Sequence, residues 1–330
     1  MRVLVTGASG FIGLALVERL AARGDRVRAL VRPTSRTAEL VRLGVELVEG
    51  SLADPASLVP AVDGCDLVVH LAGAVKALRT GDLFRVNAEG TRNVALACAG
   101  RSPPPRLVYV SSLAAAGPST GDRPRTEEDP LAPVSLYGES KLAGEDAVRA
   151  VSHQVEASVV RPPVVYGPRD RELVPPLIRM ARVGVVPRTG GEKRYSIVHV
   201  SDLCDAILLV AERGRRVGPV GTDGTYFVDD GSVHTWDEIA LAACDALGRS
   251  ARVLPLPEAV GFLVAAVSSA VAAVTGTPTI LSLDKAKELR QAAWTCSSER
   301  AARELRYRPR LPLRDGMRET VAWFREHGLA

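Results

Sequence analysis

Short apolar runs alternate with segments of helical periodicity along the first half of the chain. Five runs predict β-strands, at 3–5, 26–31, 45–50, 66–73 and 107–112. Helical patterns at 14–20 and 83–99 lie between them. The run at 66–73 is almost continuously apolar, which is typical of a parallel strand covered on both faces. The pattern therefore predicts an α/β fold, a doubly wound parallel sheet of the Rossmann type.

Three glycines, at 7, 10 and 13, separate the first strand from the first helix. Glycines in such a turn allow a tight bend, close approach of a pyrophosphate and packing of the helix on its strand. The helix N-terminus then offers unpaired N–H groups and a positive dipole end to the phosphates. The spacing is Gly-x-x-Gly-x-x-Gly and predicts a dinucleotide site. Its residues are Thr6, Gly7, Gly10, Phe11, Ile12 and Gly13.

The end of the second strand carries Arg32 where an NAD-selecting carboxylate would stand, and Arg36 follows in the next turn. A guanidinium binds a 2′-phosphate well and gains little from a free ribose hydroxyl. This favours NADP as cofactor, with NAD as the alternative if Arg32 is only a solvated turn residue. The small Ala72-Gly73 end of the fourth strand would let its backbone pass close to the cofactor, whereas His70 is interpreted as structural.

A polar pair and a Tyr-x-x-x-Lys motif follow the glycine turn. The fifth strand ends in Ser111 and Ser112, and Tyr137 and Lys141 lie on one face of the next helix. An ammonium near a phenol favours the phenolate and would lower the pKa of Tyr137 from about 10. Tyr137 would then act as a general acid or base. The intervening loop, 117–134, could close over a substrate.

Composition narrows the function further. The chain has 330 residues with 42 basic and 38 acidic side chains and no basic run, so nucleic acid is not an expected partner. Its five cysteines are scattered without ligand spacing, which argues against a metal site and a disulfide framework. Together with a glycine turn so close to Met1, which leaves no room for a signal peptide, this predicts a cytoplasmic protein.

These motifs together resemble the extended short-chain dehydrogenase/reductase family of the NAD-dependent epimerase/dehydratase type. The resemblance extends over nearly the whole chain. Its motifs are the glycine turn, 70–73, Asn87, 109–112, 137–141, 161–168, 199–202 and 305–309 with Trp323.

The resemblance implies roles for individual residues. Tyr137 would exchange a proton with the substrate oxygen, and Lys141 would bind the nicotinamide ribose and keep the tyrosine acidic. Ser112, five residues before Gly117, would hydrogen-bond the substrate. Asn87 would hold a relay water or the active-site backbone. Further cofactor contacts are expected at Ser51, Leu52, Leu71, Ala72, Gly73, Pro162 and Val164; Ser51 replaces a common aspartate, which weakens an adenine contact.

The resemblance leaves the reaction open between related activities. Sugar-nucleotide epimerases of the family often carry asparagine where Val164 stands. The sequence therefore looks more like the branch with dihydroflavonol reductases and 3β-hydroxysteroid dehydrogenases, which act on apolar alcohols and ketones. The first hypothesis is an NADP-dependent oxidoreductase for an apolar small molecule. The alternatives are an NAD-dependent epimerase or dehydratase and, more remotely, a non-catalytic dinucleotide-binding sensor or scaffold.

The predicted domains are 1–166, which bind the dinucleotide, and 167–330, which mainly bind substrate, with 196–228 returning to the Rossmann core. Candidate substrate walls are 174–178 and 190–195, whose alternative is ordinary packing and a solvated loop. Residues 259–283 carry no charge, but the apolar part, 260–274, is shorter than the ~20 residues of a membrane span. It could form a core helix, line the pocket or touch a membrane surface. Surface helices are expected at 282–290 and 313–327, and homodimerisation could use helices at 82–99 and 135–150.

Overall fold

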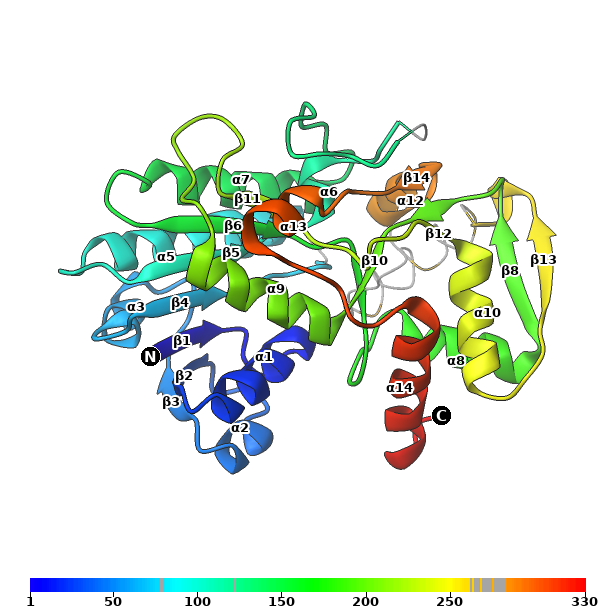
Figure 1. Cartoon of the computed structure of the whole chain (residues 1–330), viewed down its shortest axis with the longest axis horizontal. Coiled ribbons are helices and arrows are strands. Elements are labelled where there is room, and N and C mark those ends of the chain that lie inside the picture. The colour runs from blue at the N-terminus through cyan, green and yellow to red at the C-terminus, as the bar shows by residue number, and fades with distance from the viewer. Residues whose placement is uncertain (78–79, 121–122, 262, 264–267, 269–274, 276–282) are drawn as a thin grey trace.

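A parallel sheet organises the computed structural model, which describes residues 1–77, 80–120, 123–261, 263, 268, 275 and 283–330. Its seven described strands lie in the order β11-β6-β5-β4-β1-β2-β3, and every pairing between them is parallel. They are β1 (Arg2–Thr6), β2 (Arg26–Val31), β3 (Glu46–Glu49), β4 (Leu67–His70), β5 (Arg106–Val110), β6 (Ala157–Arg161) and β11 (Thr225–Phe227). The strand order reverses beside β1, where a doubly wound sheet forms its ligand crevice. This confirms the predicted Rossmann-type fold (Figure 1).

Helices cover both faces of the sheet, because each strand presents apolar side chains to both sides. One apolar core joins the sheet to α1 and α9, through residues such as Leu16, Val17 and Ile207. A second core joins the other face to α3, α5 and α7, through Leu58, Val94 and Val148. These helices are α1 (Phe11–Ala22), α3 (Pro55–Val62), α5 (Gly90–Ala99), α7 (Leu136–Ala150) and α9 (Val200–Arg213); the short α2 (Ala38–Arg42) follows β2.

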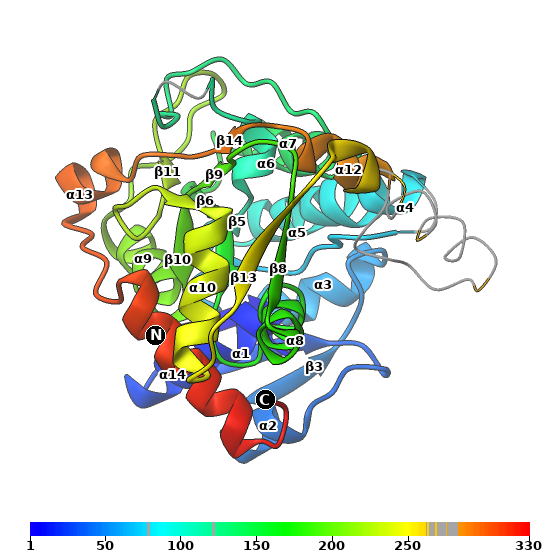
Figure 2. The ribbon, with the colours of Figure 1, turned by 90° about the vertical axis from the view of Figure 1, so that its right-hand side faces the viewer.

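The C-terminal part has its own apolar core beside the carboxyl ends of the strands. Figure 2 faces this part and shows α8, α10 and α14 around the parallel pair β8 and β13. Its elements are β7 (Val164–Tyr166), α8 (Val174–Val183), β8 (Val185–Thr189), β9 (Arg194–Tyr195), β10 (Ile197–His199), β12 (His234–Thr235), α10 (Trp236–Ala246), β13 (Arg252–Leu256), α12 (Leu283–Leu289), β14 (Ala293–Trp294), α13 (Glu299–Leu305) and α14 (Leu313–Glu326). Between these elements, α9 and β11 pack into the Rossmann part.

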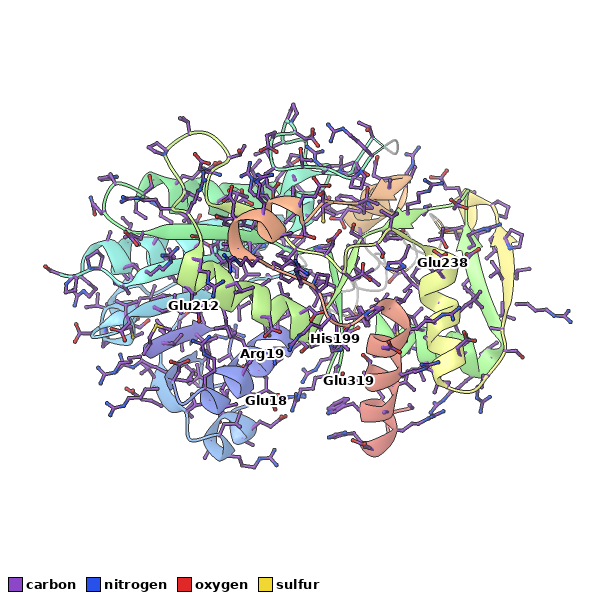
Figure 3. All side chains as sticks on the ribbon, in the orientation of Figure 1. Glu18, Arg19, His199, Glu212, Glu238 and Glu319 are labelled. Atoms are coloured by element: carbon purple, nitrogen blue, oxygen red, sulfur yellow. The ribbon has the colours of Figure 1, made fainter. Side chains whose placement is uncertain are left out.

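Charged side chains join the two parts beside α1. Arg169 has a left-handed backbone (φ 72°), which non-glycine residues adopt rarely, and its guanidinium pairs with Glu18 at 2.7 Å. Arg19 binds Asp205 of α9 at 2.6 Å. Figure 3 shows Glu18 and Arg19 together on α1, beneath His199 at the start of α9. The C-terminal part is therefore anchored to the helix that follows the glycine turn.

Two predicted elements differ in detail. The helix expected at 83–99 consists of α4 (Thr80–Phe84), a π-helical turn η1 (Arg85–Glu89) and α5. The loop 117–134 is not a detached lid, because residues on it are paired with the strand segment 293–297. Ser119 N–H donates to Ala293 O at 3.1 Å, and Arg125 N–H donates to Thr295 O at 3.0 Å. The buried carboxylate of Glu127 also accepts from Phe227 N–H at 2.8 Å.

The uncharged segment 260–274 lies mostly outside the described residues, so its predicted roles stay predictions. Within the part of the chain that is described, no helix is both long and apolar enough to cross a membrane. The surface helices expected at 282–290 and 313–327 are α12 and α14.

Candidate active site

The glycine turn has the backbone geometry that a dinucleotide cradle requires. Gly7 is left-handed (φ 72°), and a Cβ there would lie 2.8 Å from Ala72 N on the neighbouring strand connection. A Cβ at Gly13 would overlap the carbonyl oxygen of Gly7. Gly10 begins α1 without any side-chain cap, so the first N–H groups of the helix are left for a phosphate. The turn therefore fits a dinucleotide pyrophosphate, and Phe11 and Ile12 form the first turn of the same helix.

Thr6 has a structural role that its place in the motif did not reveal. Its hydroxyl lies 2.6 Å from His70 Nδ1 and accepts from Ala72 N–H at 3.2 Å. His70 Nε2 is 3.0 Å from the Thr91 hydroxyl, and the imidazole stacks on Tyr109. Burial lowers the pKa of His70 to about 3. The neutral, fully bonded His70 is thus a link between β1, β4 and α5, and the hydroxyl of Thr6 is already used by the protein.

Two exposed arginines follow β2. The side chains of Arg32 and Arg36 are both exposed, and neither has an ion-pair partner within the described parts of the chain. The backbone N–H of Arg32 donates to Ser35 Oγ at 2.9 Å, which shapes this turn. At the end of β3, the Ser51 hydroxyl accepts from Ala53 N–H, and Leu52 packs over Gly90 of α5. Both guanidinium groups are accessible to an anion at the edge of the cofactor crevice.

The two serines after β5 have different surroundings. Ser111 is buried and donates to Glu145 Oε1 at 2.6 Å, and Glu145 forms a buried ion pair with Arg161 at 2.6 Å. Ser112 instead caps the short helix α6 (Leu113–Ala116), accepting from Ala114 N–H at 3.1 Å. Its hydroxyl also opposes the effect of burial on the pKa of the Tyr137 phenol. Ser112, and not Ser111, lies beside the tyrosine.

Tyr137 and Lys141 are held by close helix packing. A Cβ at Gly138 would overlap the carbonyl oxygen of Ala114, so glycine brings the start of α7 against α6. Lys141 is buried; its ammonium donates to Val110 O at 2.8 Å and lies 4.4 Å from the centre of the Tyr109 ring. These contacts fix Lys141 beneath the ends of β4 and β5.

The expected lowering of the Tyr137 pKa is wrong for this structure. Burial raises the pKa of Tyr137 to about 12, against the hydrogen bond from Ser112, and Glu288 and Glu172 raise it further. Burial lowers the pKa of Lys141 to about 7, although Glu145 opposes this. The sequence pattern placed lysine and tyrosine on one face, but it could not show that Lys141 is drawn to a backbone carbonyl and that carboxylates approach the phenol.

Asn87 holds the backbone at the mouth of the site. Its side chain accepts from Ala74 N–H and donates to Ala74 O, both at 2.8 Å, and it also donates to Ser140 Oγ at 2.9 Å. A Cβ at Gly73 would meet Asn87 Oδ1 at 3.1 Å and Lys141 Nζ at 3.7 Å. Two roles were considered for Asn87, holding a relay water or holding the active-site backbone. These bonds support the second role, because they fix the segment after β4. Leu71, Ala72 and Gly73 run along this edge, and Pro162 and Val164 lie after β6 at the neighbouring edge.

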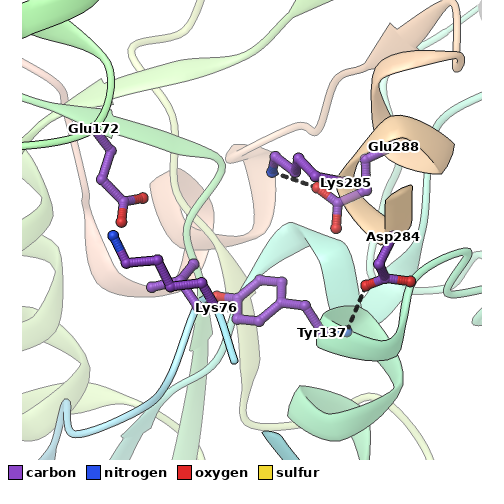
Figure 4. Close-up of a pocket in the computed structure, with 7 residues that line it drawn as sticks. Lys76, Tyr137, Glu172, Asp284, Lys285 and Glu288 are labelled. Carbon is purple, nitrogen blue, oxygen red and sulfur yellow. Dashed lines mark hydrogen bonds and ion pairs between the residues drawn. The ribbon is translucent and has the colours of Figure 1, made fainter. Parts of the chain in front are cut away.

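A small cavity of about 40 Å³ opens beside Tyr137. Figure 4 shows Lys76 and Glu172 pointing toward one another on one side of the tyrosine and α12 on the other. The other lining residues are Val75, Asp284, Lys285 and Glu288. Among the residues in the described ranges, no cluster of side chains could hold a metal ion.

The cavity contains groups that the sequence did not single out. Lys76, Glu172 and the α12 carboxylates have no local motif, and they meet only because distant loops converge. The two candidate substrate walls lie differently. Val174, Leu177 and Ile178 are buried in the C-terminal core, which agrees with the alternative of ordinary packing. Tyr195 packs in the small apolar cluster that Tyr137 also joins, which brings one end of 190–195 near the site.

Similarity to known proteins agrees with this arrangement. A model of the NAD dependent epimerase/dehydratase family matches residues 3–222. The chain is 36% identical over 326 residues to ceramide reductase of Caulobacter vibrioides, covering 99% of this chain and 95% of the relative. It is 30% identical over 339 residues to a 2-alkyl-3-oxoalkanoate reductase of Stenotrophomonas maltophilia, covering 98% and 99%.

Among solved structures, gox2253 has a TM-score of 0.82 and 30% identity over 99% of this chain and 98% of its own. The glycine turn, the doubly wound sheet and these similarities lead to one conclusion. The chain belongs to the NAD dependent epimerase/dehydratase family and is an NAD(P)-dependent enzyme of the extended short-chain dehydrogenase/reductase type.

Proposed function

We propose that the protein is an NADPH-dependent reductase that converts the ketone of a lipid-like small molecule into a secondary alcohol. The observation that carries this proposal is the phenol of Tyr137, which lines the cavity and lies on the same helix as the buried Lys141. A phenol that keeps its proton is a general acid.

In the proposed reaction, Tyr137 transfers its proton to the carbonyl oxygen as that oxygen gains the electron pair of the breaking C=O π bond. When bound, the reduced nicotinamide supplies the hydride that completes the alcohol. Ser112 donates a hydrogen bond to the same oxygen, where negative charge develops. Lys141, one helical turn further along α7, would bind the nicotinamide ribose.

The cofactor site would use backbone for the pyrophosphate and arginine side chains for selectivity. The turn at Gly7, Gly10 and Gly13 would hold the pyrophosphate. Arg32 and Arg36 would bind a 2′-phosphate, which supports NADP over NAD. Backbone at Leu52, Ala72 and Gly73 would line the adenosine and ribose side, and Pro162 and Val164 would lie near the nicotinamide.

The names of the relatives and the lining of the cavity support a substrate class for this proposal. Both relatives have names of reductases for molecules with long alkyl parts, a ceramide and a 2-alkyl-3-oxoalkanoate. The cavity, however, places Lys76 and Glu172 beside Tyr137, which are polar neighbours for a purely hydrocarbon ketone. We therefore favour an amphiphilic ketone, with hydrogen-bonding groups next to the carbonyl and an apolar chain further away. A cytoplasmic homodimer, with contacts through 82–99 and 135–150, stays a prediction.

The test combines turnover with the nucleotide content of the purified protein. NADPH consumption and alcohol formation are measured with a 2-alkyl-3-oxoalkanoate, an N-acylated amino ketone and an unsubstituted long-chain ketone. We expect reduction of the polar-headed ketones and little bound nucleotide on denaturation and mass spectrometry. Near-stoichiometric NAD without NADPH-dependent reduction would overturn the proposal in favour of an epimerase or dehydratase, which returns its hydride in each cycle.

A further inference from the structure

Side chains of helix α12 hydrogen-bond to the start of α7, the helix that carries Tyr137. Asp284 Oδ1 accepts from Leu136 N–H at 3.0 Å, and its Oδ2 lies 3.5 Å from Tyr137 N as a longer contact. Glu288 Oε1 accepts from the Ser135 hydroxyl at 2.5 Å. Ser135 in turn accepts from Gly138 N–H at 3.0 Å. Figure 4 shows this contact between Asp284 and the backbone of Tyr137.

These bonds satisfy the N–H groups that a helix leaves without intrahelical partners. The first turn of any α-helix has such groups, and side chains from nearby residues usually cap them. In α7, Ser135 caps Gly138 in this local way. The N–H of Leu136 is bonded instead by Asp284, 148 residues further along the chain. The backbone at Tyr137 is thus fixed from the C-terminal part.

Buried contacts hold α12 in place where it meets the start of α7. Ser135 and Glu288 are both buried, and the Trp294 indole donates to the carbonyl oxygen of Glu288 at 2.9 Å. Lys285 pairs with the Glu288 carboxylate, so this charge is compensated. The exposed Lys287 lies 3.6 Å from Asp284. Among the contacts described for α12, those of Asp284 reach the backbone at the start of α7 directly.

We propose that Asp284 is a positioning residue that fixes Tyr137 for proton transfer, with Glu288 supporting it through Ser135; this rests on the proposed function of Tyr137. Asp284, Lys285 and Glu288 of α12 also line the cavity beside Tyr137. A substrate in the cavity therefore contacts the element that sets the tyrosine. Displacing a reacting group by ~1 Å can lower the rate ~100-fold. Greater mobility of the first turn of α7 should therefore lower kcat.

The experiment compares Asp284→Ala, Asp284→Asn and Glu139→Gln. Glu139 is exposed in the same turn of α7. Its substitution therefore removes an equal charge while leaving the contacts between Asp284 and the α7 backbone intact. We expect Asp284→Ala to lower kcat about 30-fold while the dissociation constant of NADPH stays within twofold. Asp284→Asn, which retains one acceptor oxygen, should recover most of the rate, and Glu139→Gln should keep wild-type kcat.

Hydrogen–deuterium exchange of a peptide covering 134–141 provides a readout that needs no substrate. Exchange should be about tenfold faster in Asp284→Ala than in wild type or Glu139→Gln, because a bonded N–H loses its acceptor. Unchanged exchange in Asp284→Ala, or equal loss of kcat in Glu139→Gln, would overturn the positioning role. A wild-type protein that reduces no ketone would instead overturn the proposed function, and exchange would still decide about Asp284.

Discussion

The cofactor side and the substrate side of this site are built in different ways. The cofactor side consists of backbone: a left-handed Gly7, an uncapped helix start and a Gly13 pressed against Gly7. The substrate side consists of side chains from four separate stretches, around Lys76, Tyr137, Glu172 and Asp284. A backbone cradle can be encoded within eight consecutive residues, whereas the cavity needs the whole fold.

The cofactor side binds a group common to all dinucleotides, whereas the substrate side has to distinguish between substrates. Pyrophosphate is common to dinucleotides, and main-chain N–H groups at a helix start bind it without side-chain chemistry. Substrates of one family differ, and loops of the C-terminal part can change without disturbing the cradle. Substitutions should therefore affect cofactor binding and turnover separately.

The largest effect is expected at the proton donor. Tyr137→Phe should lower kcat by about 1,000-fold or more, since general acid catalysis contributes up to ~10⁴-fold, while NADPH affinity stays near wild type. Steady-state kinetics and fluorescence titration of NADPH measure the two quantities. Tyr226→Phe, which removes a hydroxyl bonded to Arg215 and Glu304 far from the cavity, is the control. Retained turnover in Tyr137→Phe would contradict the mechanism.

Gly13→Ala should affect the cofactor side and weaken dinucleotide binding. Its Cβ would overlap the Gly7 carbonyl, so we expect about 100-fold weaker binding of either dinucleotide, and a lower Tm. Gly10→Ala is the matched variant: its Cβ would meet the same oxygen at 3.2 Å, and the loss should be several-fold smaller. Equal affinities of the two variants would show that the tight fit at Gly13 does not shape the cradle. Both are measured by titration with NADPH and NADH.

Arg32→Asp tests the one part of the cofactor side that depends on a side chain. The ratio of NADPH to NADH affinity should fall about tenfold or more, because a carboxylate repels a 2′-phosphate and accepts from ribose hydroxyls. Arg42→Asp makes the same charge change at an exposed position on α2 and should leave the ratio unchanged. An unaltered ratio in Arg32→Asp would reduce Arg32 to a turn residue.

The smallest effect concerns the buried ammonium of Lys141. Burial lowers its folded-state pKa to about 7, below the value of about 10.4 for an exposed lysine, so the unfolded chain binds more protons between these values. The contribution of Lys141 to the free energy of unfolding should therefore rise from pH 7 to pH 10. Denaturant unfolding of wild type minus Lys141→Met should show this rise, and a flat or falling difference would contradict the buried pKa.

The local motifs were the most predictable part of the site. The strands at 26–31 and 66–73, the glycine turn and the Tyr137–Lys141 face depend on neighbours within a few residues, so periodicity and spacing reveal them. The π-helical turn at Arg85–Glu89 was not predicted; it contains Asn87, whose partner Ala74 lies on a different segment of the chain. The anchoring of Ser119 and Arg125 was also missed, since their partners Ala293 and Thr295 are about 170 residues away.

The sequence by itself determined the doubly wound sheet, the glycine turn and the family, and it predicted Tyr137 as the proton donor. Each of these depends on contiguous backbone geometry or on one helix face. Only the tertiary structure decided the direction of the Tyr137 pKa shift, the binding of Lys141 to Val110 O, and the meeting of Lys76, Glu172 and α12 around the cavity. The physical reason is that burial and the charges of sequence-distant groups set a pKa, and neither exists until the chain has folded.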